Sequence, residues 1–152
     1  MNDLERARAC ADKMYAGDKA SRALGIDIEV SGAGSATATM QVRDDMVNGF
    51  NICHGGLIFT LADTAFAFAC NAYDELTVAG SGHIEFLRPV HLHDTLRAVA
   101  REELRGERVG FYTVEVLDQD GSIVALFRGR SVSRGERLLG GQTDTENIEK
   151  TR

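Results

Sequence analysis

The chain has 152 residues, of which 43% are apolar and 26% are charged, proportions typical of a folded globular protein and unlike those of a disordered chain. This length fits one domain with a sizeable core. The formal net charge of −6 argues against a sequence-independent grip on nucleic acid or on an anionic membrane, because both attract basic surfaces. We therefore expect neither nucleic acid nor a membrane as a partner.

The cysteines and the apolar segments indicate where the protein works. Cys10, Cys53 and Cys70 have neither C-x-x-C spacing nor the spacing of a zinc site, so we expect no disulfide framework. The charged first residues lack the apolar core of a signal peptide. The longest apolar stretch, residues 57–70, is too short and too polar to span a bilayer. These features predict a cytoplasmic protein.

Apolar periodicity and turn residues predict two helices and six strands. In chain order they are a helix over 2–16, strands over 26–30 and 35–42, a loop over 44–53, a helix over 55–72, and strands over 76–89, 95–104, 109–118 and 122–133. The second helix is apolar on nearly every face, so it must be buried on most sides. A curved antiparallel sheet of five or six strands would wrap this long central helix, which predicts an α+β fold. We expect one domain over 1–137 and a disordered tail over 138–152.

The start of the buried helix holds the first candidate catalytic group. The run His54-Gly55-Gly56 lies where a loop becomes a helix. The first N–H groups of a helix have no intrahelical partner, and the helix dipole there favours negative charge. Because glycine has no side chain, a substrate carbonyl oxygen can approach the Gly55 N–H, as it does in an oxyanion hole.

Asp63 is the second candidate, a carboxylate inside the apolar helix. Burying it costs several kcal/mol unless it is paired or partly protonated, and a raised pKa suits a general base or a nucleophile. The alternative is a structural role, as a cap or as the partner of an arginine at a subunit interface. Gly55 and Asp63 lie about 12 Å apart along one helix, so two antiparallel copies of the helix would have to share the site. If both residues are catalytic, a homodimer is required.

Several further motifs join these residues in one pattern. They are Asn48, the run 54–56, the run 61–71, Ile84–Pro89 and Val124–Gly129. With them the chain resembles, from about residue 10 to 134, the PaaI-type acyl-CoA thioesterases of phenylacetate degradation within the hotdog-fold superfamily. The resemblance implies a hotdog fold, a dimer that often pairs into a tetramer, and hydrolysis of phenylacetyl-CoA or its ring-hydroxylated relatives without a metal or redox cofactor.

The same resemblance implies roles for individual residues. Asp63 would be the base or the nucleophile, the Gly55 N–H would polarise the thioester carbonyl, and Asn48 and His54 would hold the carbonyl or the attacking water. The family loop usually reads Asn-x-x-Gly-x-x-His, and here Asn51 occupies the glycine position. Asparagine tolerates a positive φ better than other non-glycine residues, so the loop can keep its shape.

An acidic protein needs a local positive site for the phosphates of CoA, which an arginine can supply. The candidate CoA-binding residues are therefore Arg88, its neighbour Pro89, and Arg130.

Other interpretations of the sequence remain open. One alternative is an enzyme for another acyl group, such as a medium-chain acyl-CoA or an acyl carrier protein thioester, and another is a non-catalytic acyl-CoA sensor. A Cys53 nucleophile is disfavoured because the side chains of neighbouring residues usually diverge, and a metal site at His91 and His93 lacks a convincing third ligand. His83 is either a satisfied polar residue or part of the acyl pocket.

Overall fold

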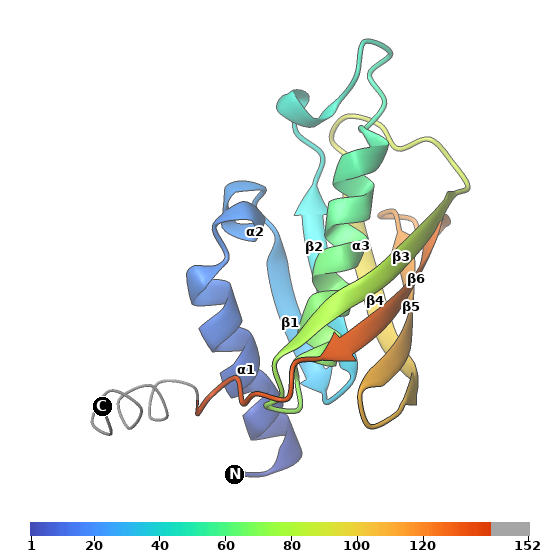
Figure 1. Ribbon diagram of the computed structural model, residues 1–152. Coiled ribbons are helices and arrows are strands. Elements are labelled where there is room, and N and C mark those ends of the chain that lie inside the picture. Colours follow the sequence, from blue (N-terminus) through green and yellow to red (C-terminus); the bar gives the residue numbers. More distant parts are fainter. Residues whose placement is uncertain (141–152) are drawn as a thin grey trace, which may run out of the picture.

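The computed structural model describes residues 1–140 and shows an α+β protein in which one antiparallel sheet wraps a central helix (Figure 1). The elements are α1 (Asp3–Gly17), α2 (Lys19–Ala23), β1 (Asp27–Gly32), β2 (Ser35–Gln41), the 3-10 turn η1 (Asp44–Met46), α3 (Gly55–Cys70), β3 (Thr77–Phe86), β4 (Thr95–Arg105), β5 (Val109–Leu117) and β6 (Ile123–Ser133). The strand order is β1-β2-β4-β5-β6-β3, with every neighbouring pair antiparallel. This arrangement confirms the predicted sheet and settles its size at six strands. No helix within residues 1–140 is long and apolar enough to cross a membrane.

The sequence pattern predicted only a turn where the structure has the short helix α2. Its start is stabilised by Asp18, whose carboxylate accepts hydrogen bonds from the Ser21 N–H at 3.0 Å and the Ser21 hydroxyl at 2.6 Å. Such a cap satisfies backbone groups that a five-residue helix leaves open. Because so short a helix shows no apolar periodicity, this cap is the signal that could have revealed it.

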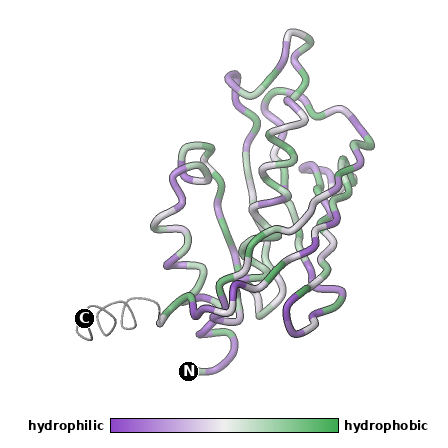
Figure 2. Tube along the Cα trace, viewed as in Figure 1, coloured by the Kyte–Doolittle hydropathy of each residue, from purple (hydrophilic) through white to green (hydrophobic). Residues whose placement is uncertain are grey.

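The core forms where α3 crosses the concave face of the sheet. Leu61, Ala62, Ala65 and Phe66 are completely buried there, and Figure 2 shows α3 mostly in hydrophobic colours. The Phe66 ring packs against Tyr112 on β5 and Phe127 on β6, with ring centroids 5.4 and 5.8 Å apart. Along β2 and β5, which face α3, buried residues alternate with residues that are mostly only partly exposed, as expected for a sheet with one covered face.

β3 forms one edge of the sheet and is unusually open. All of its ten residues except Thr77 and Ile84 are exposed. An edge strand of this length presents a row of unpaired backbone N–H and C=O groups, which favours pairing with another chain.

The segment after β6 is fastened back onto the domain. Its backbone pairs with Leu76, which donates to the Glu136 carbonyl and accepts from the Arg134 N–H, both at 2.8 Å. The buried Asp74 carboxylate accepts hydrogen bonds from the Leu139 N–H and from the Arg137 guanidinium. Two of the residues that the sequence analysis assigned to the tail therefore contact the domain: the Leu139 N–H donates to Asp74, and the Leu138 carbonyl accepts from the Lys13 ammonium at 2.6 Å. Residues 141–152 lie outside the described residues.

Asp74→Asn should weaken this fastening. Burial alone would raise the pKa of Asp74, but the hydrogen bonds from Leu139 and Arg137 outweigh it and hold this pKa below its usual value. The ionised form therefore stabilises the fold above the unfolded pKa of about 4, and this contribution is lost as the pH falls through the lowered pKa. We expect Asp74→Asn to reduce the free energy of unfolding by about 1 to 2 kcal/mol at pH 7.

Urea unfolding of the wild type and of Asp74→Asn at pH 7 and at pH 3 would measure the difference in their free energies of unfolding. This difference should be smaller at pH 3. Asp12→Asn is the matched control, since Asp12 is exposed on α1. The stabilising role of the ionised Asp74 would be contradicted if Asp74→Asn and Asp12→Asn lost equal free energies of unfolding. It would also be contradicted if the effect of Asp74→Asn did not change with pH.

Candidate functional site

A cavity of about 380 Å³ lies beside the first turn of α3, between the loop that follows η1 and the segment that follows β3. Four of the seven residues predicted from the sequence line it: Asn48, Gly55, Arg88 and Pro89. The structure thus brings residues from two distant segments of the chain to one place. His54 adjoins this group through Gly55, whereas Asp63 and Arg130 lie elsewhere.

Asn48 holds the loop on one side of this cavity. Its side-chain oxygen accepts the N–H groups of Phe50 at 2.9 Å and Ile52 at 3.2 Å. Asn51 has a φ of +59°, so this asparagine adopts the left-handed conformation expected at the usual glycine position. The loop is joined to the opposite wall by the Cys53 N–H, which donates to the Val90 carbonyl at 2.7 Å. Asn48 therefore shapes the cavity, and its oxygen is committed to the loop.

Gly55 is the first residue of α3, where an N–H has no intrahelical acceptor. None of the hydrogen bonds among residues 1–140 engages this N–H. A Cβ atom built on Gly55 would lie 3.0 Å from Cζ of Phe86, so the aromatic ring occupies the space that a side chain would need. Phe86 is 52% exposed and also lines the cavity. The sequence analysis placed this phenylalanine in a family motif but missed its contact with Gly55, which depends on tertiary packing.

His54 and Cys53 precede Gly55 and differ in their surroundings. His54 is the exposed N-cap residue of α3, and its N–H donates to the Met46 carbonyl at 2.9 Å. Cys53 is 3% exposed, and burial raises the pKa of its thiol to about 11. A thiol with so high a pKa is almost entirely protonated near neutral pH and is a poor nucleophile. The geometry therefore favours His54 over Cys53 as a group that contacts a substrate.

Asp63 lies two turns along α3 from Gly55 and is half-buried. Burial raises the pKa of its carboxyl group. No hydrogen bond or ion pair within the described part of the chain engages this carboxylate, so the structural alternative of an arginine partner is not met within one subunit. A desolvated carboxylate without a partner is the state from which a base or nucleophile can act.

Asp63 belongs to a stripe of α3 that the sheet leaves open. Gly56, Thr60, Asp63 and Ala67 are not fully buried, and their spacing places them on one helix face. The Thr60 hydroxyl donates to the Gly56 carbonyl at 2.8 Å, so its polar group is satisfied within the helix. We call these four residues the open stripe. Apart from Asp63, its side chains are small, which allows a second helix to approach closely.

The candidate residues for CoA binding and for the acyl pocket do not lie together. Arg130 and His83 lie on the outer face, away from α3, whereas Arg88 and Pro89 line the Gly55 cavity. The His83 ring hydrogen-bonds Glu85 at 2.8 Å and is exposed, which identifies it as a satisfied polar residue within one subunit. Among residues 1–140, no three histidine, cysteine or acidic side chains are grouped to hold a metal ion.

Comparison with known proteins gives consistent matches. Residues 50–125 match the thioesterase superfamily. The chain is 45% identical to the acyl-coenzyme A thioesterase PaaI of Escherichia coli over 130 residues, which are 86% of this chain and 93% of that protein.

Solved structures agree with the sequence match. The structure of the E. coli PaaI protein from the phenylacetic acid degradation operon superposes with a TM-score of 0.88 at 43% identity, covering 90% of this chain and 99% of that one. A Streptococcus mutans protein bound to acetyl CoA superposes with a TM-score of 0.70 at 27% identity, covering 74% and 90% of the two chains.

Asp63→Asn should leave the fold intact and make it more stable at neutral pH. A carboxyl group whose pKa is raised on folding binds its proton more tightly in the folded state, so the fold loses stability as the pH rises above the unfolded pKa. The neutral amide removes this penalty. We expect a higher Tm for Asp63→Asn at pH 7.5 and a difference that shrinks toward pH 4, both measurable by calorimetry. A lower Tm at neutral pH would show that Asp63 has a stabilising partner in the assembled protein.

Proposed function

The chain belongs to the thioesterase superfamily, and from that membership we propose that it hydrolyses acyl-CoA thioesters to the free acid and CoA. The observation that carries the proposal is the combination on one helix of an unengaged Gly55 N–H beside a cavity and an unpartnered Asp63 carboxylate on the open stripe. The first group suits a developing oxyanion, and the second suits a base or a nucleophile.

The active unit in this proposal is a homodimer. Two features of one subunit support it: the open stripe of α3 and the exposed edge of β3. Two antiparallel copies of α3 packed along their stripes would bring Gly55 of one subunit toward the partner's Asp63. Pairing of the two β3 edges would satisfy their free backbone groups and enclose the helices. A tetramer of two dimers and a cytoplasmic location stay predictions of the sequence analysis.

The reaction uses these groups in order. The substrate carbonyl oxygen accepts the Gly55 N–H, which stabilises the negative charge that develops there. The partner's Asp63 takes a proton from a water molecule whose oxygen attacks the carbonyl carbon, and the C–S bond breaks as the CoA thiolate leaves and is protonated. In the alternative route the carboxylate itself attacks and forms a mixed anhydride that water then hydrolyses. Both routes require Asp63 to be ionised.

The neighbouring residues position the substrate. Asn48 lines the cavity and His54 directly precedes Gly55, so the Asn48 amide N–H₂ and the His54 ring would hold the carbonyl group or the attacking water. Arg88 and Pro89 line the same cavity and would contact the CoA arm. Phe86 covers Gly55 and narrows the space for the acyl group.

Phenylacetyl-CoA or a ring-hydroxylated phenylacetyl-CoA is the proposed substrate. The 45% identity to E. coli PaaI, whose solved structure is described as coming from the phenylacetic acid degradation operon, supports this choice. A different acyl group, including medium-chain acyl-CoA or an acyl carrier protein thioester, is the nearer alternative.

Release of CoA, followed with a thiol-reactive dye, tests the function. The assay compares phenylacetyl-CoA, its ring-hydroxylated analogue and a medium-chain acyl-CoA at equal concentrations. We expect turnover of all three with the highest kcat/KM for the aryl substrates. Turnover of only the straight-chain substrate would reject the aryl assignment and keep the chemistry, whereas saturable binding without CoA release would indicate a non-catalytic acyl-CoA sensor.

Gly55→Pro and Gly55→Ala form a matched pair for the oxyanion donor. Both add a Cβ next to the Phe86 ring, but only proline removes the N–H, and proline is well tolerated at the first position of a helix. We expect kcat of Gly55→Pro to fall about 100-fold below that of Gly55→Ala. Equal activity in the two variants would exclude the Gly55 N–H as the donor.

The same proline variant tests the shared site. Gly55→Pro and Asp63→Asn, each nearly inactive alone, should regain activity when mixed after dissociation, because a mixed dimer contains one site with both native residues. Random pairing would restore about a quarter of the wild-type sites. The double variant Gly55→Pro/Asp63→Asn mixed with either single variant should regain nothing. No recovery from the two single variants, with mixed dimers shown to form, would place both groups in one subunit.

A further inference from the structure

Gly56, the second residue of α3, has no neighbour in its own subunit that requires a glycine. A Cβ atom built on it would meet nothing within 4 Å, and its φ is not positive. In the rest of α3 and in β3, β5 and β6, a Cβ on any glycine would come within 3.0 Å of another atom; these glycines are Gly55, Gly80, Gly82, Gly110 and Gly129. Close packing within the subunit therefore explains those five glycines but not Gly56.

A glycine without such a reason is unfavourable in a helix. Alanine is the better helix former, because glycine loses more conformational freedom when the chain folds. Gly56 is exposed on the open stripe, where an alanine side chain would have free space around it. The group that requires a glycine here must therefore approach from outside the subunit.

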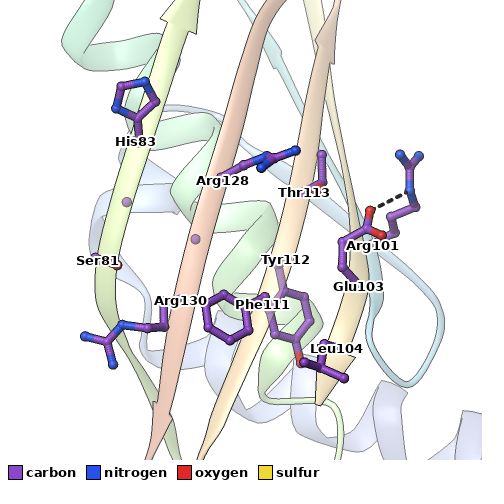
Figure 3. Close-up of a pocket in the computed structure, with 12 residues that line it drawn as sticks. Ser81, His83, Arg101, Glu103, Leu104, Phe111, Tyr112, Thr113, Arg128 and Arg130 are labelled. Carbon is purple, nitrogen blue, oxygen red and sulfur yellow. Dashed lines mark hydrogen bonds and ion pairs between the residues drawn. The ribbon is translucent and has the colours of Figure 1, made fainter. Parts of the chain in front are cut away.

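The outer face of the sheet does not point toward Gly56. Its side chains, among them His83, Arg128 and Thr113, lie on the face opposite to α3 (Figure 3). They line the largest cavity of the described chain, about 700 Å³, and Gly56 does not line it. The space beside Gly56 thus belongs to the open stripe alone.

The open stripe also holds the carboxylate that has no partner. Asp63 lies two turns from Gly56 on the same face of α3, about 10 Å along the helix axis. When two copies of a helix pack antiparallel around a two-fold axis, each contact occurs twice with the residues exchanged. An axis midway between Gly56 and Asp63, beside Thr60, places Gly56 of each subunit opposite the partner's Asp63. The distance between packed helices depends on the side chains at the contact, so a glycine there allows a close approach.

We propose that Gly56 is a positioning residue for thioester hydrolysis. Its missing side chain lets the partner's Asp63 lie against the first turn of α3, within reach of a thioester carbonyl bound at the neighbouring Gly55. A methyl group at position 56 would stand beside this carboxylate and move the two helices apart. The inference rests on the proposed function and adds to it the residue that sets the distance between two catalytic groups from different subunits.

Gly56→Ala tests the positioning role with phenylacetyl-CoA as substrate. We expect kcat to fall about tenfold with little change in KM, because a small displacement of a catalytic group slows the reaction more than it weakens binding. Gly17→Ala is the matched control, since Gly17 is a helical glycine of α1 whose added Cβ would also meet nothing within 4 Å. A wild-type kcat for Gly56→Ala, or an equal loss in both variants, would overturn the proposal.

A longer carboxylate should compensate for the added separation. Asp63→Glu extends the side chain by one methylene and should lower kcat when Gly56 is native. In the double variant Gly56→Ala/Asp63→Glu the longer side chain spans the wider gap, so its kcat should exceed that of Gly56→Ala. Two independent defects would instead combine into a larger loss. A kcat of the double variant at or below that of Gly56→Ala would therefore overturn the proposal.

The helix contact can be measured apart from turnover by analytical ultracentrifugation. Gly56→Leu should raise the Kd of the dimer about tenfold, because a bulky side chain overpacks a close contact, whereas Gly17→Leu should leave this Kd unchanged. Circular dichroism checks that both variants fold. Wild-type dimerisation of a folded Gly56→Leu would overturn the proposal. A wild-type protein that hydrolyses no CoA ester would reject the proposed function, while a raised Kd for Gly56→Leu would still place Gly56 at the contact between the helices.

Discussion

The rest of the molecule depends on one constraint: α3 is apolar around nearly its whole circumference. Each apolar face of this helix that water reaches reduces the stability of the folded state. Other parts of the protein must therefore cover nearly all of the helix. One sheet of six strands covers its buried side and stops at β3. The open stripe and the free β3 edge are two consequences of the same shortfall, and a second subunit would remedy both with a single interface.

This incomplete enclosure also accounts for the proposed placement of the catalytic groups. A carboxylate on the covered side of α3 would be dry and inaccessible, and one on an ordinary surface helix would keep its usual pKa. Asp63 lies at the boundary, where one subunit removes part of its hydration and a partner would remove more. Gly55 lies at the end of the same helix, where the exposed N–H is unavoidable. The fold therefore supplies both groups from one element, but at a separation that a single chain cannot close.

Local sequence predicted what depends on local physics. The long elements, the wrapped helix, the positive φ of Asn51 and the unengaged N–H of Gly55 all follow from periodicity or from backbone rules. The contact of Phe86 with Gly55 depends on how the end of β3 crosses α3, and no local pattern encodes it. Arg130 is opposite Ser81 in the register of β6 and β3, whereas Arg88 lies in the segment that follows β3, so their separation also depends on the tertiary arrangement.

Two aspartates show how environment rather than residue type decides a role. Asp74 is buried but receives a backbone N–H and a guanidinium, so its pKa falls and its charge stabilises the fold. Asp63 is also desolvated but receives no donor within its own subunit, so its pKa rises and its charge destabilises the fold. A protein selected for stability alone would replace Asp63 with an apolar residue, which would pack on a partner helix without cost. The charge of Asp63 at the centre of the open stripe is the strongest physical argument for the proposal that the stripe forms a reaction site as well as a subunit interface.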